Sequence, residues 1–90
     1  MSIRIVGVIG SGTMGNGIAH VFAQSGYEVI LMDIQQAFLD KGITTITKNL
    51  DRQVKKEKIS ESDKVAKLQR LKTSTDLTDL KECDFVVEAA

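Results

Sequence analysis

Short apolar runs along the chain predict buried β-strands. Residues 3–9 read IRIVGVI and are rich in β-branched side chains, and residues 27–32 read YEVILM. Residues 84–89 form a third run of this kind, residues 73–75 a shorter β-prone one, and residues 77–80 a helical turn or loop between them. Short, mostly apolar runs of this type are typical of strands that are covered on both faces, as in parallel sheets.

The segment between the first two strands carries a helical pattern. Its large apolar side chains recur at spacings of four, three and one residues on one helical face: Met14, Ile18, Val21 and Phe22. Gly26 follows where a left-handed C-terminal cap would lie. The pattern predicts a helix over residues 14–25, and a strand, helix and strand within about 30 residues indicate a parallel βαβ unit.

A longer charged stretch predicts two further helices. Residues 36–58 carry apolar side chains at spacings of four, three, four and four: Leu39, Ile43, Ile46, Leu50 and Val54. Ser60 is a predicted N-cap, and Asp63 supplies a carboxylate to the first turn that follows it. We therefore expect a second helix over residues 61–71, which forms an antiparallel hairpin with the first.

Gly10, Gly12 and Gly15 match the spacing G-x-G-x-x-G between the first predicted strand and helix. Gly10 permits the tight turn out of the strand, Gly12 lets a pyrophosphate approach the backbone, and Gly15 lets the helix pack close to the strand. The unpaired N–H groups of the first helical turn then face the phosphates. The pattern predicts a dinucleotide-binding turn, and the alternative is a purely structural glycine turn.

Asp33 ends the second predicted strand, 18 residues after Gly15. A carboxylate at this place accepts hydrogen bonds from the adenosine ribose hydroxyls and repels a 2′-phosphate. Residues 34–40 contain no basic side chain that would bind such a phosphate. NAD is therefore favoured over NADP, and FAD is a weaker competitor on the same fold. If the turn were purely structural, Asp33 would simply face solvent.

Together these patterns predict an α/β fold. The expected architecture is a Rossmann-type parallel sheet with helices on both faces and a helical hairpin, about residues 36–71, inserted after the second strand. Ninety residues are too few for the usual pair of cofactor and substrate domains. The chain also stops just after a strand that further elements should cover. We therefore expect an incomplete domain, the front of a longer polypeptide.

Composition narrows the function classes. The 12 basic and 12 acidic residues balance, so no excess charge points to nucleic acid or to an anionic membrane. No apolar run approaches the roughly 20 residues that span a bilayer. A single cysteine, Cys83, excludes an internal disulfide and a cysteine-based zinc site, and no role or metal is assigned to it. With no recognisable targeting segment, a cytoplasmic protein is expected.

Two stretches carry a resemblance to a known family. The run VGVIGSGTMGNGIAHVFAQSGYEVILMD resembles the start of the 3-hydroxyacyl-CoA dehydrogenases, particularly the bacterial 3-hydroxybutyryl-CoA dehydrogenases. The second stretch, STDLTDLKECDFVVEAA, matches the order and spacing of the same family, so the resemblance covers essentially the whole chain. The run G-x-G-x-M-G-x-G-I-A is more specific than the general dinucleotide fingerprint.

The resemblance implies an NAD-dependent enzyme of fatty-acid or butanoate metabolism. Such enzymes interconvert a 3-hydroxyacyl-CoA and the 3-oxoacyl-CoA by hydride transfer. Asp33 is expected to bind the adenine ribose, and Ala89, at the end of the later strand, to lie against the cofactor. The turn residues expected to hold the pyrophosphate are Gly10, Ser11, Gly12, Thr13, Met14 and Gly15.

The resemblance also implies a coenzyme A contact on the hairpin. Two polar positions of its first helix map to Asn49, where the family often has serine, and to Lys56. Asn49, Arg52 and Lys56 are spaced three and four apart, so they share one helical face that could meet a ligand phosphate. From spacing alone, a solvated charged face is the alternative.

His20 is the only histidine, and its place in the cofactor helix makes it a structural or surface residue. The family's catalytic histidine and carboxylate lie beyond Ala90, so we expect no catalytic residue here and no turnover by this chain alone. The C-terminal helical domain would be absent from residues 1–90, and the full-length protein is expected to be a homodimer. Another β-hydroxyacid dehydrogenase and a non-catalytic NAD-binding relative remain alternatives.

Overall fold

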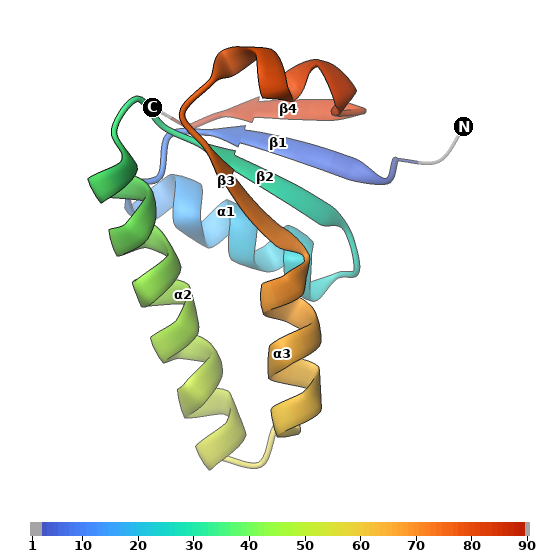
Figure 1. Cartoon of the computed structure of the whole chain (residues 1–90). Helices are drawn as coiled ribbons and strands as arrows, with labels where there is room; N and C mark the ends of the chain where they lie inside the picture. Colours follow the sequence, from blue (N-terminus) through green and yellow to red (C-terminus); the bar gives the residue numbers. More distant parts are fainter. Residues whose placement is uncertain (1–2, 90) are drawn as a thin grey trace.

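Four parallel strands form one sheet in the order β3-β2-β1-β4 (Figure 1). The computed structural model describes residues 3–89. The elements in chain order are β1 (Ile5–Ile9), α1 (Thr13–Gln24), β2 (Glu28–Met32), α2 (Gln36–Lys55), α3 (Glu61–Gln69), β3 (Leu71–Ser74), the 3-10 helix η1 (Leu77–Glu82) and β4 (Phe85–Glu88). The predicted parallel α/β fold is confirmed, with element boundaries that differ by a few residues.

The strand order creates a switch point beside β1. From β1 the chain moves outward to β2 and then β3, and returns to pair β4 with the other side of β1. In the register, Ile9 of β1 lies beside Met32 of β2 and Glu88 of β4, so these strands end at one edge of the sheet. Open parallel sheets bind ligands outside the carboxyl ends of their strands at such a point.

The helices lie on both faces of the sheet, as predicted. Figure 1 shows α1, α2 and α3 on one face and η1 on the other. Side chains from β1, β2, α1 and α2 form a single core. Its fully buried members are Val6, Val8, Ala19, Ala23, Val29, Leu31, Leu39, Ile46 and Leu50. Apolar burial of this kind is the main stabilising contribution to a small domain.

The buried face of α1 is made of small residues. Gly15, Ala19 and Ala23 recur every four residues and are buried against the sheet. By contrast, Met14 is 68% exposed and Val21 is 61% exposed. Of the four large apolar side chains that predicted this helix, only Ile18 and Phe22 pack against the core, at its margin. Small side chains form the fully buried stripe, because they let α1 pack closely on the sheet.

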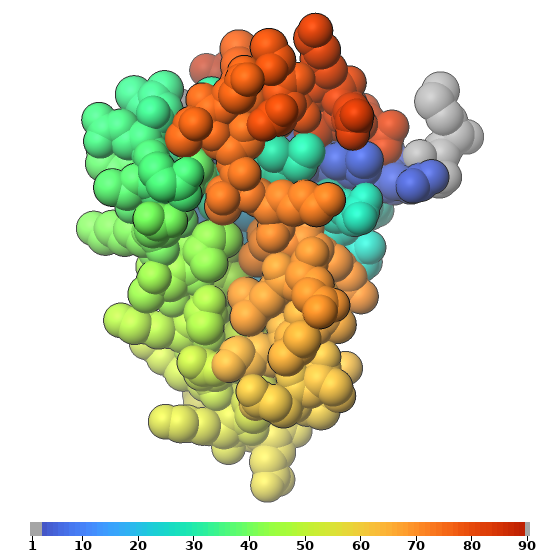
Figure 2. Space-filling model, viewed as in Figure 1, coloured from blue at the N-terminus to red at the C-terminus, as the bar shows by residue number. Residues whose placement is uncertain are grey.

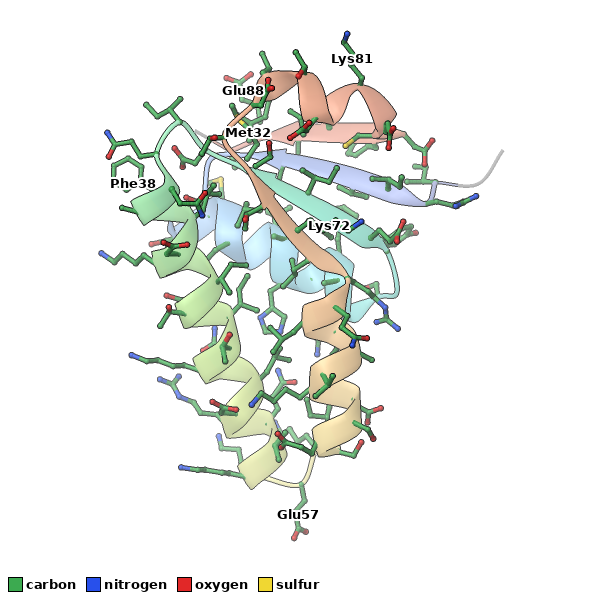
Figure 3. The ribbon with its side chains drawn as sticks, in the orientation of Figure 1. Met32, Phe38, Glu57, Lys72, Lys81 and Glu88 are labelled. Atoms are coloured by element: carbon green, nitrogen blue, oxygen red, sulfur yellow. The ribbon has the colours of Figure 1, made fainter. Side chains whose placement is uncertain are left out.

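The helical hairpin projects away from the sheet. Figure 2 shows its tip, coloured yellow, as the part farthest from the strands, and Figure 3 shows Glu57 pointing outward from it. Glu57 has a φ of 58°, and α2 ends at Lys55 rather than at the predicted residue 58 because the chain reverses there. Lys64 forms a salt bridge with Asp51, which joins the two helices near this end.

Helix α3 begins as predicted and ends two residues early. The Ser60 hydroxyl accepts the Asp63 N–H, and the Asp63 carboxylate accepts the Ser60 N–H, which completes a capping box. Leu71 was predicted to be helical, and this prediction is wrong. Leu71 opens β3 and pairs with Val29 of β2, because the sheet supplies it with backbone partners and with contacts to the core.

Candidate functional site

The glycine turn follows β1 at the switch point. Gly10 has a φ of 98°, and its N–H donates a hydrogen bond to the Met32 carbonyl oxygen at 2.8 Å, so the turn is tied to the end of β2. A Cβ added to Gly15 would lie 1.6 Å from the Gly10 carbonyl oxygen. No side chain fits there, and glycine at both positions lets α1 start directly against the turn.

Gly12, unlike Gly15, is next to open space. It is the N-cap of α1 in an extended conformation, and a Cβ added to it would meet no atom within 4 Å. No side chain of residues 3–89 caps this helix end, and no acidic residue lies in its first turn. The backbone N–H groups and the positive end of the helix dipole therefore face open space that a phosphate can fill.

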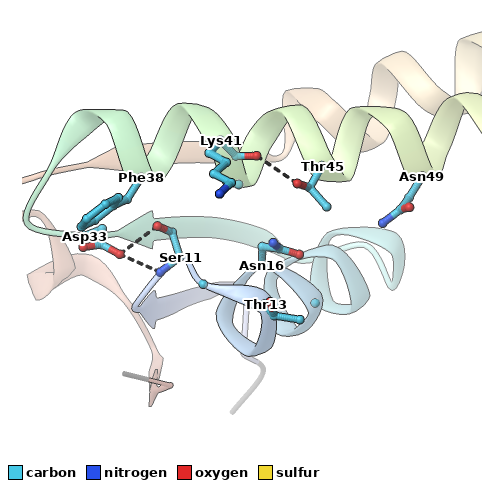
Figure 4. Close-up of a pocket in the computed structure, with 11 residues that line it drawn as sticks. Ser11, Thr13, Asn16, Asp33, Phe38, Lys41, Thr45 and Asn49 are labelled. Carbon is cyan, nitrogen blue, oxygen red and sulfur yellow. Dashed lines mark hydrogen bonds between the residues drawn. The ribbon is translucent and has the colours of Figure 1, made fainter.

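Asp33 is tied to the glycine turn through Ser11. The Ser11 N–H and its hydroxyl both donate to Oδ2 of Asp33 at 2.8 Å (Figure 4). The Ile34 N–H donates to Oδ1 at 2.7 Å. Burial raises the pKa of Asp33, but the hydrogen bonds from Ser11 and Ile34 outweigh it and bring the pKa below its ordinary value. The carboxylate is thus ionised at neutral pH and held in one orientation.

The structure brings most of the predicted turn residues together at this edge of the sheet. Ala89 donates its N–H to the Ile9 carbonyl oxygen at 2.8 Å and lies beside the turn, since a Cβ on Gly15 would be 3.7 Å from the Ala89 Cβ. Thr13 is exposed at the start of α1. Met14 is exposed as well, but it belongs to a shallow apolar surface along α1 with Ile18, Val21 and Phe22.

A cleft of about 700 Å³ runs between α1 and α2, beside the turn and Asp33. Figure 4 shows polar side chains of α2 facing those of α1 across it. The residues that line it are Ser11, Gly12, Thr13, Asn16, Gly17, Asp33, Phe38, Lys41, Gly42, Thr45 and Asn49. Those from α2 were missed by the sequence analysis apart from Asn49, although their spacings of three, one, three and four residues place them on one face.

The two residues predicted to contact coenzyme A lie in different surroundings. Asn49 lines the cleft, half-buried, and its Oδ1 accepts a hydrogen bond from Nη1 of Arg52 at a long 3.4 Å. Lys56 is the exposed C-cap of α2, about two turns farther along, and does not line the cleft. The cleft therefore unites Asn49, but not Lys56, with the glycine turn.

His20 lies half-buried on α1, away from the cleft. Its Nε2 atom is buried and has no hydrogen-bond partner among the described residues. Burial, together with the nearby Lys67 ammonium, lowers the pKa of His20 below its ordinary value. Within residues 3–89, no group of three or more histidine, cysteine or acidic side chains could hold a metal ion.

Residues 5–90 match the family model described as "3-hydroxyacyl-CoA dehydrogenase, NAD binding domain". The chain belongs to this family. The family's cofactor is NAD, and the open space at Gly12, the uncapped start of α1 and the oriented Asp33 carboxylate fit its pyrophosphate and ribose. No helix within residues 3–89 has the length and apolar character needed to cross a membrane.

Individual relatives of the chain carry names that match this family. This NAD-binding domain is 48% identical over 88 residues to a 3-hydroxybutyryl-CoA dehydrogenase of Bradyrhizobium diazoefficiens, covering 98% of the chain and 30% of the relative. A probable 3-hydroxybutyryl-CoA dehydrogenase of Deinococcus radiodurans is 47% identical, with 92% of the chain and 30% of the relative covered. The chain therefore spans about a third of the length of the curated relatives it matches.

A solved structure shows the same arrangement. The crystal structure of (S)-3-hydroxybutyryl-CoA dehydrogenase from Ralstonia eutropha superposes with a TM-score of 0.96 at 52% identity, covering 99% of this chain and 31% of that one. The strand order, the hairpin and the position of the glycine turn are thus those of a known dehydrogenase domain.

Proposed function

We propose that this chain is the N-terminal NAD-binding part of a 3-hydroxyacyl-CoA dehydrogenase. The complete enzyme would interconvert 3-hydroxybutyryl-CoA, or a related 3-hydroxyacyl-CoA, and the 3-oxoacyl-CoA. The observation that carries the proposal is the pair of hydrogen bonds from Ser11 to Asp33 at the open glycine turn, in a chain whose relatives include 3-hydroxybutyryl-CoA dehydrogenases. When bound, NAD accepts or supplies the hydride in such a reaction.

The residues of this chain would bind and orient the cofactor. The N–H groups at the start of α1 would receive the pyrophosphate at Gly12, and Asp33 would accept hydrogen bonds from the adenosine ribose. Ala89, at the end of β4, would lie under the cofactor beyond the turn. The proton-transfer groups would come from residues outside this chain, so we propose that the chain alone has no dehydrogenase activity.

The ribose assignment is tested by cofactor selectivity. A 2′-phosphate about 4 Å from the Asp33 carboxylate would be repelled by about 1 kcal/mol in water and about 4 kcal/mol at a partly buried site. We expect NADP to bind at least about fivefold more weakly than NAD. Calorimetric titration of Asp33→Ala should show weaker NAD binding and a smaller preference over NADP. The control is Asp40→Ala, since Asp40 is exposed on α2 outside the cleft.

A coenzyme A contact on α2 is the second part of the proposal. Asn49 lines the cleft, and Lys56 follows on the same helical face toward the tip of the hairpin. Lys56→Ala in the complete enzyme should raise the KM for acetoacetyl-CoA and leave the KM for NADH unchanged. Lys58→Ala removes a neighbouring exposed charge and serves as the control. Equal KM values for Lys56→Ala and the wild type would reject this contact.

Three further properties of the complete protein are proposed. The resemblance supports a homodimer assembled through residues outside this chain. The balanced charge supports a protein that binds neither nucleic acid nor membranes, and we propose that it acts in the cytoplasm, as the sequence led us to expect. Light scattering on the complete protein tests the dimer. An assay with acetoacetyl-CoA and NADH distinguishes an active dehydrogenase from a non-catalytic NAD-binding relative.

A further inference from the structure

The cleft is lined by a positively charged side chain that the glycine-turn pattern did not include. Lys41 is on α2 and lines the cleft between α2 and α1, where Figure 4 shows it between Phe38 and Thr45. It is the only lysine or arginine among the residues that line this cleft, and Asp33 is the only carboxylate. Lys41 is one residue beyond the segment 34–40, whose lack of basic side chains favoured NAD in the sequence analysis.

The packing of α2 fixes Lys41 beside the turn. A Cβ added to the neighbouring Gly42 would lie 3.2 Å from the Ser11 carbonyl oxygen and 3.7 Å from the Asn16 Cβ. Helix α2 therefore lies close to the glycine turn and to the first turns of α1 at this point. Because Lys41 is adjacent to Gly42 and lines the cleft with Gly12 and Thr13, its flexible stem can bring the ammonium to the start of α1.

The charges around Lys41 leave it available for an external anion. It takes part in no salt bridge among residues 3–89. The Asp33 carboxylate accepts its hydrogen bonds from Ser11 and Ile34 rather than from a lysine. The start of α1 adds the positive end of a helix dipole and no acidic side chain. An anion at this place would meet two sources of positive potential from opposite walls of the cleft.

We propose that Lys41 binds a phosphate group of an adenine nucleotide and is an affinity-determining residue of this cleft. This role rests on the proposed function, which brings two such ligands to the protein. One source is the pyrophosphate of NAD, whose expected place over Gly12 is next to Lys41. The other source is a phosphate of coenzyme A. The proximity to the glycine turn favours the pyrophosphate of NAD.

The test compares nucleotides that differ in their phosphates. Calorimetry on the complete protein would measure binding of NAD, ADP-ribose, adenosine and coenzyme A to the wild type, Lys41→Gln and Lys41→Arg. Lys48→Gln is the matched control, because Lys48 is exposed on the same helix and does not line the cleft. Lys41 is itself exposed, so its replacement should not disturb the fold, which circular dichroism can verify.

We expect Lys41→Gln to weaken the binding of ADP-ribose and NAD by about tenfold, whereas Lys41→Arg and Lys48→Gln should bind them about as tightly as the wild type does. Adenosine, which has no phosphate, should bind all variants equally. The dissociation constant of Lys41→Gln should also depend less on salt. A loss confined to coenzyme A would support the phosphate role and assign it to the second source.

Unchanged binding of ADP-ribose, NAD and coenzyme A to Lys41→Gln would overturn the role of Lys41 while leaving the proposed function intact. A wild-type protein that binds neither NAD nor ADP-ribose would instead reject the proposed function, and the role of Lys41 with it. Equal weakening by Lys48→Gln would also overturn the proposal, because it would show a general charge effect rather than a contact in the cleft.

Discussion

Two glycines of the same turn are expected to fail in different ways when each is replaced by alanine. At Gly15, the new Cβ would lie 1.6 Å from the Gly10 carbonyl oxygen, whereas real Cβ contacts essentially never fall below 3.0 Å. Either the carbonyl or α1 must move by about 1.4 Å, the difference between these two distances. At Gly12, the new Cβ would meet no protein atom within 4 Å, and the backbone is extended.

Gly15→Ala should lower the stability of the fold, whereas Gly12→Ala should lower the affinity for NAD. Overpacking a close contact costs about 1 to 3 kcal/mol, and a clash with backbone belongs at the upper end. A loss of about 3 kcal/mol is a large part of the roughly 5 to 13 kcal/mol expected for a domain of this size. Gly12→Ala should leave the free energy of unfolding nearly unchanged and weaken NAD binding by about tenfold or more, because its Cβ fills the space the pyrophosphate needs.

Urea denaturation and calorimetry check the pair. With a slope of about 1 kcal/mol per M, the urea midpoint of Gly15→Ala should fall by about 3 M, while that of Gly12→Ala stays near the wild type. A Gly15→Ala variant within about 0.5 kcal/mol of the wild type would refute the steric reasoning. Undiminished NAD binding by Gly12→Ala would refute the placement of the pyrophosphate.

Three further predictions concern the helices. Gly17→Ala should stabilise the chain by about 0.5 to 1 kcal/mol in thermal unfolding, because the position is exposed within α1 and its added Cβ meets no atom within 4 Å. Ser60→Ala should cost about 1 kcal/mol, measured by urea denaturation, because the hydroxyl that accepts the Asp63 N–H is lost. Burial and Lys67 hold the pKa of His20 below 6.5, so the unfolded chain binds the proton first, and the free energy of unfolding should fall as pH drops through 6.5. His20→Gln should reduce this fall between pH 7 and pH 5, and an unchanged pH dependence would show that His20 is not its source.

The sequence by itself determined the local structure of the glycine turn. The strand before Gly10 and the turn at the spaced glycines form from neighbouring residues, since they reflect local backbone conformation. The same holds for the start of α3 at Ser60, whose capping box uses neighbours in the chain. These local features were predicted correctly, whereas the hydrogen bonds from Gly10 to Met32 and from Ser11 to Asp33 form only in the folded sheet.

Tertiary structure decided what the periodic patterns left open. The apolar stripe of α1 predicted a helix but not its fully buried face, because small residues at Gly15, Ala19 and Ala23 allow close approach to the sheet. Leu71 became a strand residue because β2 offers it a backbone partner. In the same way, Lys41 lines the cleft with Asp33 only because Gly42 of α2 packs closely against Ser11. Spacing along a helix says which side chains share a face, but packing between elements decides what that face meets.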